Sequence, residues 1–142
     1  MHDLEDAFFS LDSARQSKLF ITSFYEDERP LQNTTGKLDW RLRGALSKYI
    51  LSGWITGTLE ETIYIPVKYH TGFCHLLLVG LGKRAHANVA GVAHSIDGLK
   101  NIANKIYKLK FERVALSQTC FPGVQENQIK NSWKGMRIEF FL

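Results

Sequence analysis

Apolar and polar residues alternate along this chain in blocks that predict strands and helices in turn. Continuous aromatic and β-branched runs are typical of strands in a buried sheet, and short polar or glycine-containing stretches separate them. Five such runs predict strands at 18–25, 61–67, 73–79, 111–116 and 136–142. A shorter apolar patch at 7–9 predicts an additional first strand, followed by a turn at 11–13. Pro66 favours the end of the strand 61–67, because proline interrupts the hydrogen bonding between strands.

Apolar residues at helical spacing predict two long helices between these strands. The first has possible caps at 33–36, an end near 52–53, and the apolar positions Leu38, Leu42, Ala45, Leu46, Tyr49 and Ile50. The second begins near Asn88 and carries the stripe Val89, Val92, Ala93, Ile96, Leu99, Ile102, Ala103, Ile106 and Leu109. A short turn or helix is expected at 124–130. This alternation predicts an α/β fold of three layers, a mixed and mostly parallel sheet with helices on both faces.

Length and composition are those of an ordinary globular protein. A chain of 142 residues, 44% hydrophobic and 23% charged, is long enough for a core of its own, so we predict a single domain over 1–142. No apolar run approaches the roughly 20 residues that cross a bilayer. The start of the chain, 1–6, is acidic where a signal peptide would be basic and then apolar. We therefore expect a cytoplasmic protein with no membrane contact.

The residues that could perform chemistry are few and scattered. Cys74 lies inside an apolar strand, and Cys120 lies near the end of another. His75 is the neighbour of Cys74, but adjacent residues on a strand point to opposite faces, so the two cannot form a nucleophile–base pair. An acidic run at 26–28 has oxygen ligands for a divalent cation, yet three acidic residues in a loop are usually solvated surface. The spacing of His86 and His94 does not match a helical metal pair. We predict no catalytic residue, no metal and no cofactor.

A glycine-containing turn follows the most apolar strand and is the one candidate ligand site. In the run 79–84 the backbone can turn sharply at the two glycines, and its N–H groups and cations suit an anion. The candidate ligand-binding residues are Gly80, Gly82, Lys83 and Arg84. Neither a dinucleotide-binding glycine pattern nor a Walker loop is present, and a purely structural turn explains the same glycines.

Three segments together resemble the amino-terminal domain of the leucine aminopeptidase family. They are Glu28-Arg29-Pro30, Asp39-Trp40-Arg41-Leu42, and Val79-Gly80-Leu81-Gly82-Lys83 followed by a long helix. The segments occur in the family's order, and the likeness spans roughly 4–116. The resemblance implies a macro-like α/β fold. In that family the metal ligands and catalytic groups lie in a separate carboxy-terminal domain, so it also implies a chain without peptidase activity. The family's amino-terminal domain takes part in oligomer assembly, and related macro-like domains bind ADP-ribose through loops at strand ends.

Two surfaces suggest partners. Trp40 falls off the apolar stripe of its helix and is flanked by Arg41 and Arg43, a combination typical of interface centres. The segment 83–113 is rich in cations within a chain of formal net charge +4, so it could contact nucleic-acid phosphates. A helix that buries one stripe also needs polar residues opposite it, and this accounts for the same lysines.

These features leave three functional hypotheses. The first is a non-catalytic interaction or oligomerisation module, which associates with itself or with a peptidase-like partner chain. The second is a macro-like binder of a nucleotide or an ADP-ribose derivative. The third, ranked below both, is a weak nucleic-acid binder.

Overall fold

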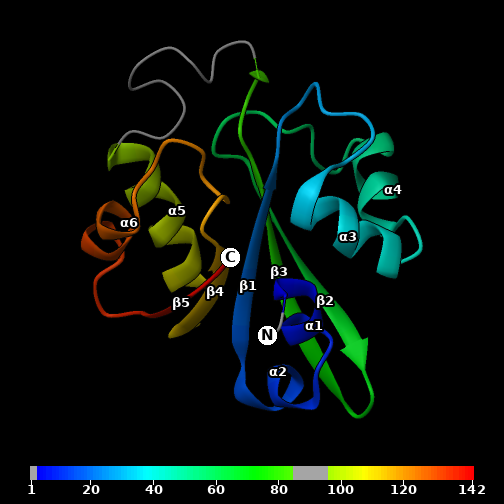
Figure 1. Cartoon of the computed structure of the whole chain (residues 1–142), viewed down its shortest axis with the longest axis horizontal. Helices are drawn as coiled ribbons and strands as arrows, with labels where there is room; N and C mark the ends of the chain where they lie inside the picture. Colours follow the sequence, from blue (N-terminus) through cyan, green and yellow to red (C-terminus); the bar gives the residue numbers. More distant parts are fainter. Residues whose placement is uncertain (1–2, 85–95) are drawn as a thin grey trace.

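A mixed five-stranded sheet runs through the centre of the protein (Figure 1). The computed structural model describes residues 3–84 and 96–142. The strand order is β2-β3-β1-β4-β5, with the bounds β1 Lys18–Phe24, β2 Thr62–Tyr69, β3 Gly72–Gly80, β4 Arg113–Ser117 and β5 Arg137–Phe141. All neighbours pair in parallel except β2, which is antiparallel to β3. The mixed, mostly parallel sheet predicted from the sequence is confirmed.

Helices cover both faces of this sheet and complete the three predicted layers (Figure 1). One face carries α1 Leu4–Phe8, α2 Leu11–Gln16, α3 Asn33–Arg41 and α4 Ala45–Leu51, and the other carries α5 Ile96–Lys108 and α6 Glu126–Ser132. Alternate residues of β1 supply the two cores: Leu19 and Ile21 lie in one cluster, and Phe20 and Phe24 in the other. No helix in the described residues is long and apolar enough to cross a membrane.

The first predicted strand is wrong, because residues 7 and 8 form the end of helix α1 and residue 9 is its C-cap. Leu4 and Phe8 are one helical turn apart, and both are buried at the same face of α1. The predicted turn at 11–13 is instead the beginning of α2, where the Ser10 hydroxyl oxygen accepts a hydrogen bond from Ser13 N at 3.0 Å.

The predicted helix through 38–50 is two helices. Arg43 and Gly44 adopt left-handed backbone angles, with φ of 57° and 80°, and this ends the helical hydrogen bonding between α3 and α4. The Asp39 carboxylate then accepts hydrogen bonds from the backbone N–H groups of Leu46 and Ser47, at 2.9 and 3.1 Å. The apolar stripe is nevertheless continuous, because both helices pack on the same core.

Strand β2 continues past Pro66 to Tyr69, contrary to the prediction that proline ends it. Because β2 is an edge strand of the sheet, the missing N–H of Pro66 leaves no inner neighbour unpaired. The predicted later strands are confirmed as β4 and β5, and the predicted short helix as α6. The predicted helix start near Asn88, and also His86 and His94, lie outside the described residues.

Candidate functional site

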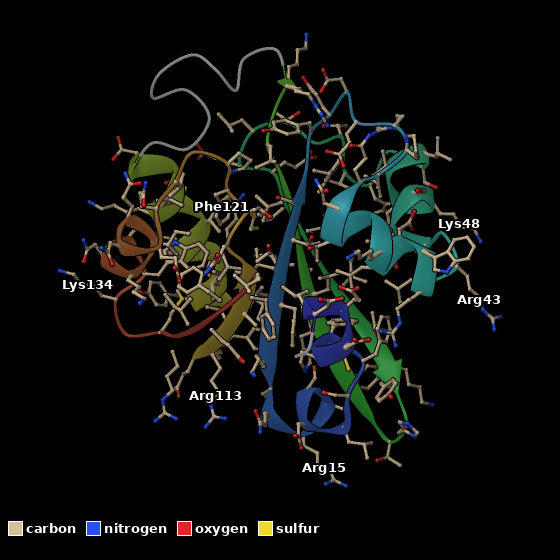
Figure 2. All side chains as sticks on the ribbon, in the orientation of Figure 1. Arg15, Arg43, Lys48, Arg113, Phe121 and Lys134 are labelled. Atoms are coloured by element: carbon tan, nitrogen blue, oxygen red, sulfur yellow. The ribbon has the colours of Figure 1, made fainter. Side chains whose placement is uncertain are left out.

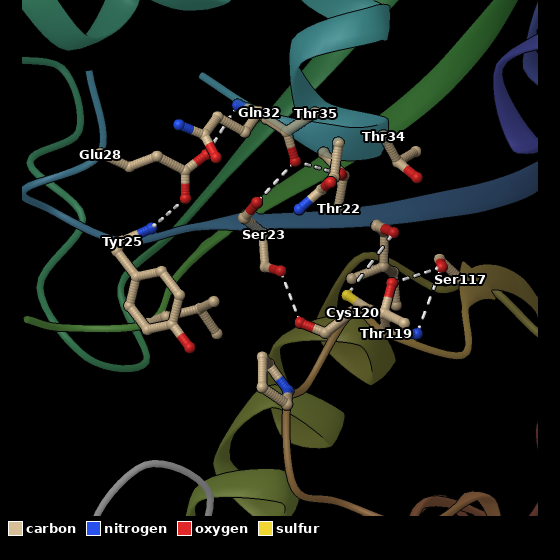
Figure 3. Close-up of a pocket in the computed structure, with 14 residues that line it drawn as sticks. Thr22, Ser23, Tyr25, Glu28, Gln32, Thr34, Thr35, Ser117, Thr119 and Cys120 are labelled. Carbon is tan, nitrogen blue, oxygen red and sulfur yellow. Dashed lines mark hydrogen bonds between the residues drawn. The ribbon is translucent and has the colours of Figure 1, made fainter. Parts of the chain in front are cut away.

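A small polar cavity, the strand-end pocket, lies at the carboxyl ends of the parallel strands (Figure 3). It has a volume of about 60 Å³. Its walls come from the end of β1 (Thr22 and Ser23), the end of β4 (Ser117), and the start of α3 (Thr34 and Thr35). Parallel pairing of β1 with both β3 and β4 brings three strand ends to the same edge of the sheet. In open α/β sheets this is the edge at which ligands bind.

Buried hydroxyl groups hold the walls of the pocket together. The Thr35 hydroxyl donates to the Ser23 carbonyl oxygen at 2.5 Å, and its oxygen lies 2.5 Å from the Thr22 hydroxyl oxygen. Because the Thr35 proton goes to Ser23, Thr22 is the donor between the two hydroxyls. The Ser23 hydroxyl in turn donates to the Cys120 carbonyl oxygen at 2.5 Å. These bonds fix α3 and the 117–120 segment against β1, so the pocket has a preorganised floor.

Glu28 closes one side of the pocket and corrects an expectation from the sequence. The run 26–28 was expected to be solvated surface, but Glu28 is only 8% exposed. Its carboxylate accepts hydrogen bonds from the backbone N–H groups of Tyr25 and Gln32, at 3.3 and 2.8 Å, and from the Arg84 guanidinium at 3.3 Å. Buried charges require such partners. Among the described residues there is no group of three or more side chains that could hold a metal ion.

The start of α3 leaves polar groups available at the pocket. The backbone N–H groups of Asn33, Thr34 and Thr35 make no hydrogen bond within the described residues, as is usual for the first turn of a helix. Asn33 has a left-handed φ of 53°, a conformation that asparagine tolerates better than most residues. All three residues line the cavity. Unpaired N–H groups at a helix start favour an anion or another acceptor.

The predicted glycine turn lies beside this pocket, and its backbone is already occupied. The N–H groups of Gly80, Leu81 and Gly82 donate to carbonyl oxygens of Glu61, Phe24 and Gly57 at 2.8 to 2.9 Å. Leu81 lines the pocket. In this structure the turn itself therefore presents no free N–H group from 80–82 to an anion.

The two cations after the turn differ in their surroundings. The Arg84 guanidinium reaches Glu28 and lies 4.9 Å from the centre of the Tyr25 ring. The backbone N–H of Arg84 donates to the Asp27 carboxylate at 3.0 Å, and this hydrogen bond lowers the pKa of Asp27. Lys83 is exposed at the same edge. A ligand role for Gly80, Gly82, Lys83 and Arg84 stays a prediction.

The second predicted site lies away from the pocket, at the far end of α3. Trp40 is 84% exposed, so its expected outward orientation is observed. Arg41 is held on α1, where its guanidinium donates to the Asp6 carboxylate at 3.0 Å and lies 4.2 Å from the centre of the Phe9 ring. Arg43 is exposed and forms no ion pair within the part of the chain described. Whether a partner covers this surface stays a prediction.

The thiols are unsuited to nucleophilic chemistry in this fold. Burial raises the pKa of the Cys120 thiol to about 12, although Cys120 lines the pocket. Burial also raises the pKa of Cys74, which lies in the core with 0% exposure, as expected for a small buried hydrophobe. Thiols with raised pKa values are poor nucleophiles.

Sequence reasoning did not identify the hydroxyl residues of the pocket. Thr22 and Ser23 lie in a strand whose apolar neighbours dominate the pattern, and Ser117 ends another. The one available signal was the run 33–36, which was interpreted only as a set of possible helix caps.

Comparison with known proteins supports the fold. No family model matches the sequence, and no curated protein sequence matches it. The structure is similar to the macrodomain of Mycobacterium tuberculosis DarG, with 15% identity, a TM-score of 0.60, and coverage of 92% of this chain and 93% of that one. The macrodomain of Thermus aquaticus DarG gives 9% identity, a TM-score of 0.59, and coverage of 87% and 88%.

The likeness extends to part of an aminopeptidase. A mutant of tomato leucine aminopeptidase matches with 15% identity and a TM-score of 0.52, over 87% of this chain and 28% of the enzyme chain. The matching part is the amino-terminal region of the enzyme. The chain therefore has a macrodomain-like α/β fold, which leucine aminopeptidase also contains in that region.

Proposed function

We propose that this protein is a macro-like binding module that takes a nucleotide or an ADP-ribose derivative at the strand-end pocket. The observation that carries the proposal is the set of unpaired N–H groups on Asn33, Thr34 and Thr35 beside a buried cluster of hydroxyls. The fold supports it, because the similar structures include two macrodomains. ADP-ribose is the ligand that the resemblance to macro-like domains implied from the sequence.

The dimensions of the pocket limit how such a ligand would lie. A volume of about 60 Å³ accommodates one small polar group, whereas whole drug-sized ligands usually occupy roughly 300 Å³ or more. One phosphate or ribose end would enter beside the start of α3. The remainder would lie outside the strand ends, where Lys83 and Arg84 supply positive charge.

We also propose that the module binds without catalysis. The buried carboxylate of Glu28 accepts hydrogen bonds from two backbone N–H groups and from Arg84, so both of its oxygens are already engaged. A general base needs an accessible, reactive lone pair at the site of proton transfer. The raised pKa of Cys120 argues against a thiolate nucleophile in the same pocket.

Titration with ADP-ribose and with AMP tests the binding proposal by calorimetry and thermal unfolding. Ligand at one hundred times its Kd stabilises a protein by about 2.7 kcal/mol, which corresponds to roughly 5–10 °C for a domain of this size. Thr34→Tyr places a ring at the pocket wall and should abolish the shift. Thr71→Tyr, at the exposed tip of the β2–β3 hairpin, is the matched control and should keep it. The proposal is wrong if millimolar ADP-ribose and AMP give neither heat nor a melting shift.

A second candidate function, association through Trp40, is favoured by a different observation. Trp40, Leu51 and Trp54 are 84%, 81% and 72% exposed, and large apolar side chains exposed to this degree within one short segment are typical of partner surfaces. The expected partner is a second copy of the chain or a peptidase-like chain.

Light scattering on wild type and Trp40→Ala tests self-association. We expect Trp40→Ala to be a folded monomer and Trp54→Ala, as a comparison, to show whether the surface extends along α4. A wild-type chain that is monomeric at high micromolar concentration would exclude a homo-oligomer. A peptidase-like partner chain would then remain as the candidate occupant.

A further inference from the structure

Three cations lie side by side where the parallel strands β1, β4 and β5 begin, at the end of the sheet opposite the strand-end pocket. Lys18 of β1 pairs in register with Arg113 of β4, and Arg113 pairs in register with Arg137 of β5. Register partners in a parallel sheet project from the same face, and neighbouring strands are roughly 4.8 Å apart. The three positive side chains therefore start within about 10 Å of one another. Figure 2 shows Arg113 and Arg15 extending outward at this edge.

The charge of this row is only partly compensated. Glu139 lies on the same face of β5, and its carboxylate is 2.6 Å from Lys18 Nζ. Arg113 and Arg137 form no ion pair within the described residues. Like charges opposite one another on adjacent strands destabilise a sheet. An anion bound between the two guanidinium groups would remove that cost.

The row also lines a concave surface. An open groove of about 310 Å³ lies on the part of the sheet between α2 and β5. It is bordered by Gln16, Lys18, Arg113, Arg137 and Glu139. Guanidinium groups match phosphate oxygens with two parallel hydrogen bonds each, which a lysine cannot do. Two arginines on adjacent strands therefore suit more than one phosphate of the same ligand.

We propose that Lys18, Arg113 and Arg137 form a binding site for the phosphate groups of a linear phosphate polymer, either the phosphodiester backbone of a single-stranded nucleic acid or inorganic polyphosphate. The site is independent of the strand-end pocket, because it lies where the parallel strands begin and the pocket lies where they end. It shares Arg113 with the cation-rich segment 83–113 expected from the sequence, but Lys18 and Arg137 lie outside that segment.

Fluorescence anisotropy with a labelled oligothymidylate, repeated with inorganic polyphosphate as competitor, tests this site. We expect Arg113→Gln/Arg137→Gln to weaken binding by about tenfold and to reduce the salt slope by about 1.4, since each phosphate contact on a single strand contributes about 0.7. Lys100→Gln/Lys108→Gln removes the same charge from α5 and is the matched control, with both values close to wild type. Thermal unfolding of each variant establishes that it is folded.

The outcomes separate the sources and the alternatives. Tighter binding of the oligonucleotide indicates a nucleic-acid backbone, and tighter binding of polyphosphate indicates the inorganic chain; either supports the site. The site is refuted if the arginine pair and the α5 control lose equal affinity, since net charge alone would then explain binding. Competition by polyglutamate as effective as that by polyphosphate would refute phosphate recognition. No binding of either phosphate polymer at low salt would refute it as well.

Discussion

Replacing Gly80 by alanine should destabilise the protein strongly, for a steric reason that the structure makes explicit. A β-carbon on Gly80 would lie 2.2 Å from the Thr58 carbonyl oxygen and 2.5 Å from the Gly57 carbonyl carbon. Both are backbone atoms, so no side-chain rotation relieves the contact. Gly80 is not in the left-handed region, and the cost is therefore one of space and not of backbone conformation.

The size of the expected loss of stability follows from the two backbone segments that must move apart. Overpacking a close contact costs about 1–3 kcal/mol. Separating the two segments also strains the hydrogen bonds from Gly80 N to the Glu61 carbonyl oxygen, at 2.8 Å, and from Glu60 N to the Gly80 carbonyl oxygen, at 3.0 Å. At about 1 kcal/mol each, these bring the loss to about 3–5 kcal/mol, or roughly 10–15 °C in Tm.

Urea and thermal unfolding of Gly80→Ala and Gly135→Ala measure this difference. Gly135 has a left-handed φ of 86° with no atom near its β-carbon position, so its alanine variant pays only a conformational cost of about 1–2 kcal/mol. If Gly80→Ala unfolds at the wild-type midpoint, or no earlier than Gly135→Ala, the steric reasoning is refuted.

Two further predictions concern the face of the sheet that α5 and α6 cover. His75 Nδ1 lies 2.6 Å from the Tyr64 hydroxyl, and burial lowers the pKa of His75. The unfolded chain therefore binds a proton more readily than the folded protein, so the free energy of unfolding should fall as pH drops from 7.5 to 5.5. The fall should be smaller in His75→Phe. Equal pH dependence of the two proteins in urea unfolding would contradict this. Trp133 is 1% exposed and its indole N–H donates to the Leu99 carbonyl oxygen at 2.9 Å, so Trp133→Phe should cost about 2–3 kcal/mol. An unchanged urea midpoint would show that this hydrogen bond and the indole volume contribute nothing.

The sequence predicted the sheet well because buried strands have an unambiguous local signal. Every residue of β3 from Leu76 to Gly80 is buried, and the apolar run that shows this is visible without any tertiary information. The division between α3 and α4 was missed because both helices bury residues on one continuous stripe. Only the left-handed Arg43 and the capping carboxylate of Asp39, which depend on the folded chain, reveal it.

The candidate sites were less predictable, because they are made by contacts between distant segments. Thr22 and Thr35 share a hydrogen bond across 13 positions, and Ser23 reaches Cys120 across 97. No local pattern marks such pairs. The exposure of Trp40 was predicted because its spacing against Leu38 and Leu42 is a local property of one helix.

The two sites, at opposite ends of the parallel strands, should bind their ligands independently. Strand β1 connects them with seven residues, which at about 3.3 Å per residue separates the pocket from the cation row by roughly 20 Å. The Debye length at physiological salt is about 8 Å, so charge on one ligand is largely screened at the other. Saturation with ADP-ribose should therefore leave the affinity for polyphosphate unchanged within about twofold, and by thermodynamic linkage the reverse should hold. Anisotropy titrations with and without ADP-ribose measure this, with Thr34→Tyr as the control for occupancy of the pocket. A change of tenfold would mean that the two ligands share a site or that the strands transmit a conformational change, and it would contradict the separation argued from the parallel register.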